Sequence, residues 1–495
     1  MDRRITRRSF ITAAAALAGA TALPASRAAS LYDRQRLRIP DLLDARSLGQ
    51  SIALEARAGT SEFFPGVASP TLGFNGTYLG PTIRLHSGDD VQVAVTNRMH
   101  QATAVHWHGL LVPGELDGGP HQPIAAGATW RPVLPVRQPA ATLFYHSHLH
   151  HATAEQVYFG LAGMLMVRDA AEAALGLPSD YGVDDLPLIL QDRQFEGGRL
   201  VMPGGMMTVM NGARGDTLLV NGTANAYAPV PARRVRLRIV NASNARDYHL
   251  AFDDGRAFHW IATDSGLLAT PLERRALSLS PGERAEILVD FSDGAATTLL
   301  TGPDRNAPMM GMMGRRPGPR SDLWTQPVLA FEVGPPGGVS AALPARLAEL
   351  EAWDASRAVR TRRFTLDMGM GMMGGGGMGM RGGASTGGAM DMFSINGRAF
   401  DMARIDERVR LGDLEVWEVT GAMMAHPFHI HGVRFRVLGT EAPQGAGFKD
   451  TVRVEAPVRL LVRFTQPTLA AAPFMYHCHI LEHEDHGMMG QFTVA

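Results

Sequence analysis

Four pairs of histidines, each separated by one residue, carry most of the chemistry that this sequence could perform. In a β-strand, residues i and i+2 point to the same face, so each pair presents two imidazoles to one side. Eight imidazoles are enough to hold three metal ions and to leave positions open for a ligand such as dioxygen. The motifs are His106-Trp107-His108, His146-Ser147-His148, His429-Ile430-His431 and His477-Cys478-His479.

Cys478 is the only cysteine of the chain, and it lies between two of these histidines. One cysteine excludes an intrachain disulfide and a cysteine-based zinc or iron–sulfur framework. In a strand its side chain faces away from the flanking imidazoles, so it can bind a separate metal. With two histidines and a weak axial thioether it completes the blue-copper arrangement, in which copper holds the cysteine as thiolate. The other members of this set are His426, His483 and Met488.

Composition bounds what kind of protein could carry these motifs. The chain has 495 residues, of which 45% are hydrophobic and 19% charged, so it can bury a sizeable core. At roughly 150 residues per domain, this length predicts about three domains. A formal net charge of -1 gives no electrostatic footprint for nucleic acid or an anionic membrane.

Short alternating strands are the elements that must position the motifs. Val91, Val93 and Val95 alternate with polar residues, and the same period of two recurs at Val235–Ile239 and Val433–Val437. This period is typical of half-buried strands, so the predicted class is all-β in sandwich-sized units. Only Ala170–Leu175 and Ala342–Trp353 read as short helices.

A repeat divides the chain. Two predicted strands at Thr82–Thr96 precede the first histidine pair, and two at Arg408–Thr420 precede the third. A middle copy at Arg234–Asn241 leads to no such pair. Three copies of one β unit, with ligands in the first and last, are the simplest account. The segment Met368–Met392 is rich in Gly and Met and reads as a loop.

The N-terminus resembles an export signal. Arg7-Arg8 is followed by Ser9-Phe10, an apolar stretch to about Leu23 and then small residues. This order predicts a twin-arginine signal over residues 1–29 and export of the folded protein. The apolar stretch is too short to span a bilayer, so no stable membrane anchor is expected. The predicted location is the periplasm, and the twin-arginine export machinery is a predicted partner.

The motifs HWHG, HSH, HPFHIHG and HCHILEHEDHGM resemble those of three-domain multicopper oxidases. Within that family the chain looks most like bacterial periplasmic copper-efflux (cuprous) oxidases and bacterial laccases. The resemblance implies three cupredoxin-like Greek-key sandwiches, at residues 30–170, 171–340 and 341–495. It also implies four copper ions, one type 1, one type 2 and a type 3 pair.

The resemblance assigns copper ligands by motif position. His106 and His429 would bind the type 2 copper. The type 1 copper would be bound by His426, Cys478 and His483, with Met488 axial, because the spacing after His483 favours Met488 over Met489. The type 3 pair would be bound by His108, His146, His148, His431, His477 and His479.

The family chemistry is one-electron oxidation of four substrate equivalents, coupled to reduction of dioxygen to two waters. Electrons would arrive at the type 1 copper and cross Cys478 to the three other coppers. Similar oxidases carry acids at the positions of Asp117 and Glu484, so these two carboxylates are predicted proton donors.

The expected electron donor is Cu(I), a phenol, or both. Thioethers favour Cu(I), and the predicted substrate-copper residues lie in and near the Met-rich loop. They are Met368, Met370, Met372, Met373 and Met424. One departure matters: related cuprous oxidases carry an acid before the Met pair, whereas this chain has Ala422, with Asp367 and Asp391 as other carboxylates.

Several alternatives stay open at this stage. The chain could be a general laccase with an incidental Met-rich loop, or it could oxidise iron(II) or manganese(II). It could also be a non-catalytic copper-binding or structural cupredoxin protein, although such relatives lose ligands and this chain has every one. Copper nitrite reductase is a further alternative, but it needs only a type 1 and a type 2 site, and eight clustered imidazoles exceed that requirement. A monomer is expected.

Overall fold

The alternating pattern becomes strands in the computed structural model, which describes residues 34–306, 326–336, 342–369, 392–421, 423–439 and 445–495. In β6 (Asp90–Asn97), Val91, Val93 and Val95 are buried, whereas the residues between them are not. The same holds for Phe435 and Val437 in β30 (Arg434–Leu438). The predicted all-β class, built of cupredoxin-like sandwiches, is confirmed.

The first sandwich contains two sheets around one apolar core that includes Val93 and Trp107. One sheet runs in the order β2 (Leu42–Asp44), β5 (Thr82–His86), β11 (Ala162–Arg168), β10 (Ala141–Ser147) and β7 (Val105–His108). The other contains β4 (Val67–Phe74), β3 (Ser51–Phe64), β6 and β8 (Thr129–Trp130), with β9 (Val133–Pro135) also paired to β6.

The second sandwich encloses a core that includes Leu237 and Leu250. Its first sheet has the order β1 (Gln35–Arg36), β16 (Ala226–Ala232), β24 (Gln326–Pro336), β23 (Thr297–Thr301), β18 (Tyr248–Phe252) and β21 (Ala276–Leu279). Its second has β15 (Thr223–Ala224), β14 (Thr217–Val220), β12 (Asp185–Glu196), β17 (Arg234–Asn241), β22 (Arg284–Asp290), β19 (Phe258–Thr263) and β20 (Gly266–Arg274), and β13 (Arg199–Val201) pairs with β12.

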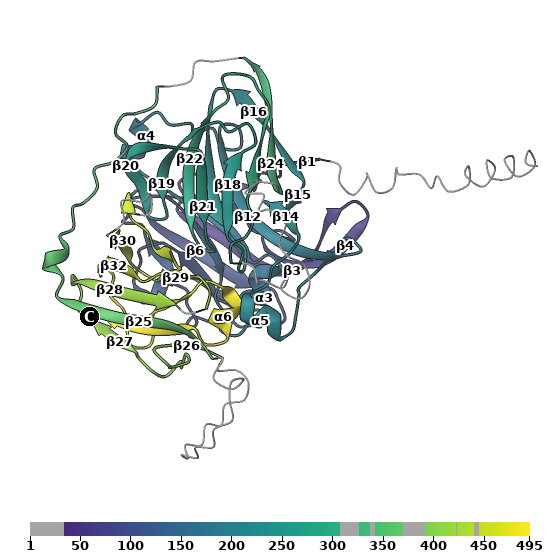
Figure 1. The fold of residues 1–495 in the computed structure, drawn as a ribbon. Coiled ribbons are helices and arrows are strands. Elements are labelled where there is room, and N and C mark those ends of the chain that lie inside the picture. The colour runs from purple at the N-terminus through teal and green to yellow at the C-terminus, as the bar shows by residue number, and fades with distance from the viewer. Residues whose placement is uncertain (1–33, 307–325, 337–341, 370–391, 422, 440–444) are drawn as a thin grey trace, which may run out of the picture.

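The third sandwich encloses Trp417, Phe428 and Tyr476. One sheet runs β26 (Phe393–Ile395), β25 (Arg360–Met368), β28 (Leu414–Gly421), β32 (Val458–Arg463) and β30. The other runs β27 (Glu407–Val409), β34 (Met489–Val494), β33 (Phe474–Cys478), β29 (His426–Ile430) and β31 (Thr451–Val454). In Figure 1 the second sandwich stands at the top and the third lies at the lower left. The domain boundaries at residues 170 and 340 stay predictions.

Strand β17 differs from its prediction as a half-buried strand. Arg236 and Arg238 alternate with its apolar residues, yet both are 1% exposed. They face β10 of the first sandwich and form ion pairs with the buried carboxylates of Asp185 and Glu286. A strand that packs on both faces can hold charged residues on one of them only where each charge is paired.

The helices are few and short among the described residues. They are α3 (Thr153–Tyr158), α4 (Ala170–Ala174), α5 (Met206–Asn211) and α6 (Leu481–Asp485), with 3-10 turns η1 (Gly114–Leu116) and η2 (Ala355–Arg357). The helix predicted at residues 170–175 is confirmed, but the one predicted at 342–353 is wrong. There the amide of Leu347 donates instead to the carbonyl of Ala269, and its side chain enters the second core. None of the described helices is long and apolar enough to cross a membrane.

Candidate metal centres

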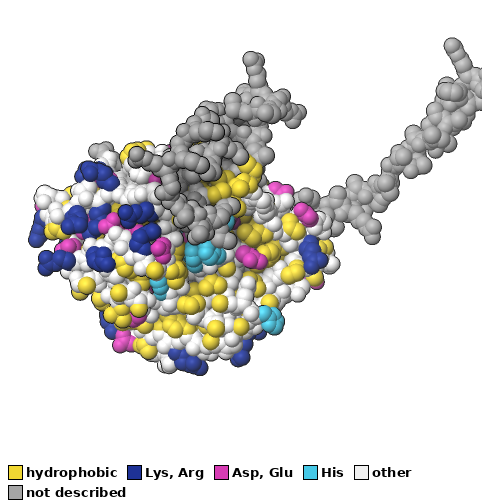
Figure 2. Space-filling view, turned by 90° about the horizontal axis from the view of Figure 1, so that it is seen from below, with side chains coloured by type: hydrophobic (Ala, Val, Ile, Leu, Met, Phe, Trp, Pro, Cys, Tyr) yellow, Lys and Arg dark blue, Asp and Glu magenta, His cyan; other side chains and the backbone are white. Residues whose placement is uncertain are grey.

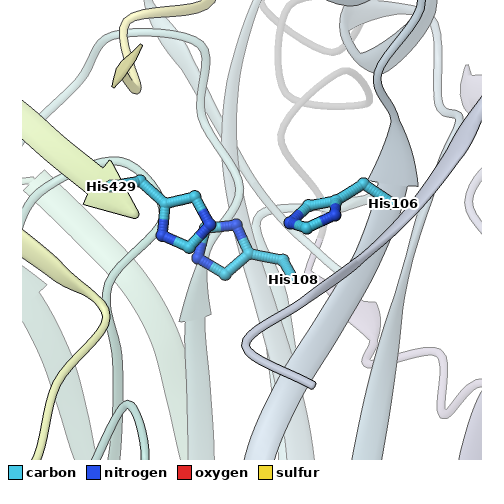
Figure 3. Close-up of side chains that lie close together, drawn as sticks. All are labelled: His106, His108 and His429. Carbon is cyan, nitrogen blue, oxygen red and sulfur yellow. The ribbon is translucent and has the colours of Figure 1, made fainter. Parts of the chain in front are cut away.

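Antiparallel pairing brings the four histidine motifs together in twos. On β7 and β10 the partner of His106 is His146, and between β29 and β33 the partner of His429 is His477. The first and third sandwiches then face each other across the eight imidazoles, all of which are buried. Two rings from opposite sandwiches, His108 and His429, stack with centroids 3.7 Å apart (Figure 3).

The eight imidazoles divide into groups whose ligand atoms lie within 4.8 Å of one another. Each group draws on both sandwiches, so the centre exists only where the two meet. The six residues predicted for a type 3 pair separate into two triads of three, which the motif spacing alone does not reveal. The groups are His108, His146 and His479; His148, His431 and His477; and His106, His108 and His429.

Several ring nitrogens in these groups are buried and have no hydrogen-bond partner. The Nε2 atoms of His106, His146 and His429 are of this kind, as is the Nδ1 atom of His108. A buried polar atom left unpaired costs about 1–3 kcal/mol, so such a cluster needs a ligand. Unpaired imidazole nitrogens that lie within 4.8 Å of one another fit borderline metal ions such as copper.

The opposite nitrogens of these rings are held in place. The Nδ1 atom of His106 donates to the Asp117 carbonyl at 3.0 Å, and that of His429 donates to the Asp450 carbonyl at 2.9 Å. The Nδ1 atom of His146 donates to the Ser147 carbonyl at 2.8 Å. These bonds fix the tautomer, so that each Nε2 lone pair faces the centre.

The protonation state of the cluster also suits metal binding. Burial is the main reason that the pKa of His429 falls to about 3. Burial likewise lowers the pKa of further cluster histidines well below the ordinary value, so these rings are neutral and able to coordinate. These residues are His108, His146, His148, His431 and His479.

A second, separate set surrounds Cys478. Its Sγ atom lies 3.4 Å from Nδ1 of His426 and 3.6 Å from Nδ1 of His483, and all three residues are buried. Burial raises the pKa of the Cys478 thiol, so a thiolate here needs a cation beside it. This donor set fits a blue-copper site.

Strand register favours Met488 over Met489 as the axial group. Met489 pairs with His477, and directly paired residues share a face, so Met489 faces away from Cys478. The amide of Cys478 donates to the carbonyl of Met488 at 3.1 Å. Met488, with Cys478, also belongs to the core of the third sandwich.

The end of β33 connects the two kinds of centre, as its alternation predicts. Cys478 lies in the His₂Cys set, whereas His477 and His479 each belong to one of the two triads. Cys478 is therefore the direct neighbour in sequence of one ligand of each triad.

Two carboxylates approach the triads. The Oδ2 atom of Asp117 lies 2.7 Å from Nδ1 of His431. The Oε2 and Oε1 atoms of Glu484 lie 3.1 Å and 3.3 Å from Nδ1 of His477 and His148. Successive residues of a helix point about 100° apart, so α6 can direct His483 to Cys478 and Glu484 to the triads. Both acids are buried.

The predicted substrate-copper residues are only partly described. Met368 and Met424 are half-buried against the core that contains Cys478 and Met488. Met370, Met372, Met373 and Ala422 lie outside the described residues, as does Asp391. Asp367 accepts a hydrogen bond from the amide of Gly397 and so is engaged in a turn.

Some neighbours of the centres were not predicted from sequence. The backbone carbonyl of Met210 in α5 accepts a hydrogen bond from Nε2 of His483, a contact between residues far apart in the chain. Asp450 and Thr451 contact His108 and His429, and no motif spacing indicated them. The sequence offers only the hydrogen-bonding residue types as a signal for these neighbours, because the contacts join segments that are far apart in the chain.

Comparison with known proteins places these centres in a family. Sequence models described as multicopper oxidase match residues 55–172 and 380–495. A protein named Cell division protein FtsP from Rahnella sp. (strain Y9602) is 40% identical over 501 residues, with 99% of each chain covered. The protein of that name from Escherichia coli (strain K12) is 39% identical over 500 residues, again with 99% of each chain covered.

Solved structures agree. A bacterial laccase-like multicopper oxidase, CueO from Ochrobactrum sp., shares 39% identity at a TM-score of 0.82 and covers 93% of this chain and 100% of its own. A multicopper oxidase from Campylobacter jejuni, described as a metallo-oxidase, shares 28% identity at a TM-score of 0.78, with 94% and 96% covered. The chain therefore belongs to the multicopper oxidase family. Relatives at 38–40% identity include a laccase-like oxidase and proteins named cell division protein.

Proposed function

We propose that this protein is an oxidase that takes single electrons from a reducing substrate and delivers four of them to dioxygen, which becomes two waters. The observation that carries the proposal is the group of unpaired, buried imidazole nitrogens beside a separate His₂Cys set. Bound copper supplies the one-electron chemistry at both places. The chain's own residues orient the ligands, exclude water and connect the two places through β33.

Four coppers are assigned to these residues. His426, Cys478 and His483, with Met488 axial, would hold type 1, and His106 and His429 would hold type 2. One type 3 copper would be held by His108, His146 and His479, and the other by His148, His431 and His477. The test is copper content together with the visible spectrum. Four coppers per chain and a strong thiolate-to-copper band support the proposal, whereas zinc, or a colourless protein after copper loading, contradicts it.

Proton supply falls to Asp117 and Glu484. Water formation needs four protons, and a buried cluster can receive them only through side chains or ordered water. The Oδ1 atom of Asp117 is buried without a hydrogen-bond partner, and the buried carboxylate of Glu484 contacts only the rings of His148 and His477, so both acids can hold or pass a proton beside the cluster.

Cu(I) and phenols are the proposed electron donors, which makes copper detoxification the proposed role. Met206, Met207 and Met423 are exposed, and Met424 is half-buried near the type 1 set, so soft thioethers surround the place where electrons would arrive. Figure 2, a view of the molecule from below, shows hydrophobic side chains spread over this face, with many basic side chains gathered to one side. Such a face suits a neutral aromatic donor as well as a Cu(I) ion.

The Met-rich loop provides the discriminating experiment. The amide of Gly369 donates to the Met392 carbonyl at 2.6 Å, so the loop ends meet and residues 370–391 can be replaced by a short Gly-Ser turn. We expect this variant to lose Cu(I) oxidation and to keep or raise phenol oxidation. Equal loss of both activities would instead favour a general laccase in which the loop has no substrate role.

A role in cell division is the second candidate, because proteins of that name match 99% of this chain. Under this alternative, loss of the protein impairs division, and a variant that binds no copper still supports division. Complementation of a division defect by a Cys478→Ser variant, which cannot form the type 1 site, separates it from the oxidase role. Rescue equal to wild type would favour a structural function.

Export through the twin-arginine machinery to the periplasm is proposed from the N-terminal motif alone. Cell fractionation tests it: Arg7→Lys/Arg8→Lys should retain the protein in the cytoplasm. Periplasmic recovery of that variant would contradict the proposal.

A further inference from the structure

His108 is oriented differently from most of its neighbours in the cluster. Six of the other rings have Nδ1 beside a carbonyl or carboxylate oxygen: His106, His146, His148, His429, His431 and His477. In His108 it is Nε2 that is engaged, 3.1 Å from both Asp450 Oδ1 and Thr451 Oγ1, whereas Nδ1 is buried without a partner. The acceptor at Nε2 therefore decides which nitrogen faces its triad.

Asp450 contacts two of the cluster histidines, one through its side chain and one through its backbone. Its carboxylate contacts His108, while its backbone carbonyl accepts the Nδ1 hydrogen of His429 at 2.9 Å. The hydroxyl of Thr451 donates to the same carboxylate at 2.9 Å. Thr451 is the first residue of β31, which pairs with β29, and Asp450 directly precedes it.

Arg284 holds Asp450, and it comes from the second sandwich, whose described residues contribute to none of the metal-ligand groups. Its Nη1 and Nη2 atoms lie 2.6 Å and 2.5 Å from the two carboxylate oxygens, which is a bidentate pair. Its remaining donors are satisfied by the carbonyls of Thr142, Gly282 and Asp264. The guanidinium is thus fully buried and fixed by all five donors.

Gly109, directly after His108, leaves room for this pair. A Cβ atom there would lie 2.5 Å from Arg284 Nη2 and 2.7 Å from Asp450 Oδ2, and the residue has a φ of +86°. The backbone at the end of the first histidine motif is therefore packed directly against the ion pair.

We propose that Arg284 and Asp450 are positioning residues of the cluster, which hold His108 in the tautomer and orientation that present Nδ1 to copper. The second sandwich then has a specific role, because it supplies the guanidinium of Arg284. This guanidinium holds the Asp450 carboxylate of the third sandwich, and the carboxylate in turn orients His108 of the first. This inference rests on the proposed copper cluster but not on which substrate is oxidised.

The test compares Arg284→Met with Arg238→Met. Both variants leave a buried carboxylate without its guanidinium, but Arg238 pairs with Asp185 and Glu286 and contacts no cluster residue. The readouts are copper content, the paramagnetic signal of type 2 copper, the near-ultraviolet band of the type 3 pair and the visible type 1 band. For Arg284→Met we expect about 10–100-fold weaker copper binding at the cluster with the type 1 band intact. Arg284→Lys, which cannot form the bidentate pair, should be intermediate, and Arg238→Met should keep all four coppers.

A second variant guards against misfolding. In Arg284→Met/Asp450→Leu both charges are removed, and replacing a buried ion pair by apolar groups is often neutral for stability. This double variant should fold and still lose the cluster coppers while it keeps the type 1 band. Full cluster copper in Arg284→Met or in the double variant, or equal loss in Arg238→Met, would overturn the inference. A wild-type protein that binds no copper would instead refute the proposed function.

Discussion

The Nε2 atom of His483 lies 3.1 Å from the carbonyl oxygen of Met210. Since Nδ1 of His483 faces Cys478, Nε2 is the edge of the ring that a donor would approach. Helix α5 (Met206–Asn211) covers that edge with its last turn and packs against α6, which carries His483. On the proposed function, a donor would therefore pass its electron through or beside α5.

This relationship predicts a change in donor preference when α5 is removed. Replacing residues 206–211 by a Gly-Ser stretch of equal length should raise kcat/KM for a bulky phenol several-fold, because the His483 edge becomes accessible. Stability should change little, since α5 has no fully buried residue. Steady-state kinetics with a phenol and with Cu(I) measure the effect. The matched control is Met206→Ser/Met207→Ser, which keeps the helix and should leave phenol oxidation unchanged. An unaltered phenol kcat/KM after removal of α5 would show that donors do not approach this edge.

Loss of either cluster carboxylate should slow turnover without changing the type 1 colour. We expect Asp117→Asn and Glu484→Gln each to lower kcat by about 10²-fold, the lower end of general acid–base contributions, because neither amide can donate a proton. Oxygen-consumption rates measure turnover, and the visible band reports on the type 1 site. Glu482→Gln is the control, since its carboxylate accepts from Asn244 at 2.9 Å and faces away from the triads. Equal slowing in the control would point to a general effect on α6.

Only one of two adjacent methionines should tune the type 1 copper. Met488→Leu removes the weak axial thioether, which should raise the reduction potential and shift the visible spectrum. Met489→Leu should leave both unchanged, because Met489 faces away from Cys478. Redox titration of both variants measures the difference. A potential shift in Met489→Leu alone would reverse the assignment.

A buried charge network should make stability depend on acid pH. Burial raises the pKa of Glu286, but Arg236 and Arg238 outweigh it and lower the pKa from the ordinary 4.5 to about 2. Because the folded-state pKa is the lower one, this contribution is complete above about pH 4.5 and is lost as the pH falls towards 2. Its size is about 3 kcal/mol, from 1.36 kcal/mol per pKa unit.

Glu286→Gln tests this contribution. The variant leaves two buried guanidiniums short of a partner, so the free energy of unfolding near neutral pH should fall by about 3–5 kcal/mol. Chemical denaturation between pH 2 and pH 7 should show a flatter pH dependence below 4.5 in the variant. Parallel curves for both proteins would mean that Glu286 keeps an ordinary pKa in the folded state.

The sequence was sufficient for features that depend on local spacing. The period of two in Val91–Val95 predicted β6, and the same period predicted that His477 and His479 share a face that Cys478 does not. These inferences held because side-chain direction along a strand is set by the backbone itself.

Tertiary structure alone decided the rest. Division of the six histidines proposed for the type 3 pair into two triads depends on how the first and third sandwiches meet, since each triad combines both. The contact between His108 and Asp450 joins residues 342 positions apart, and Arg284 enters it from the second sandwich. Charged residues in β17 are buried because another sandwich packs on them, which strand periodicity does not encode. Spacing along the chain specifies which side of an element a residue faces, whereas packing between elements specifies what it meets there.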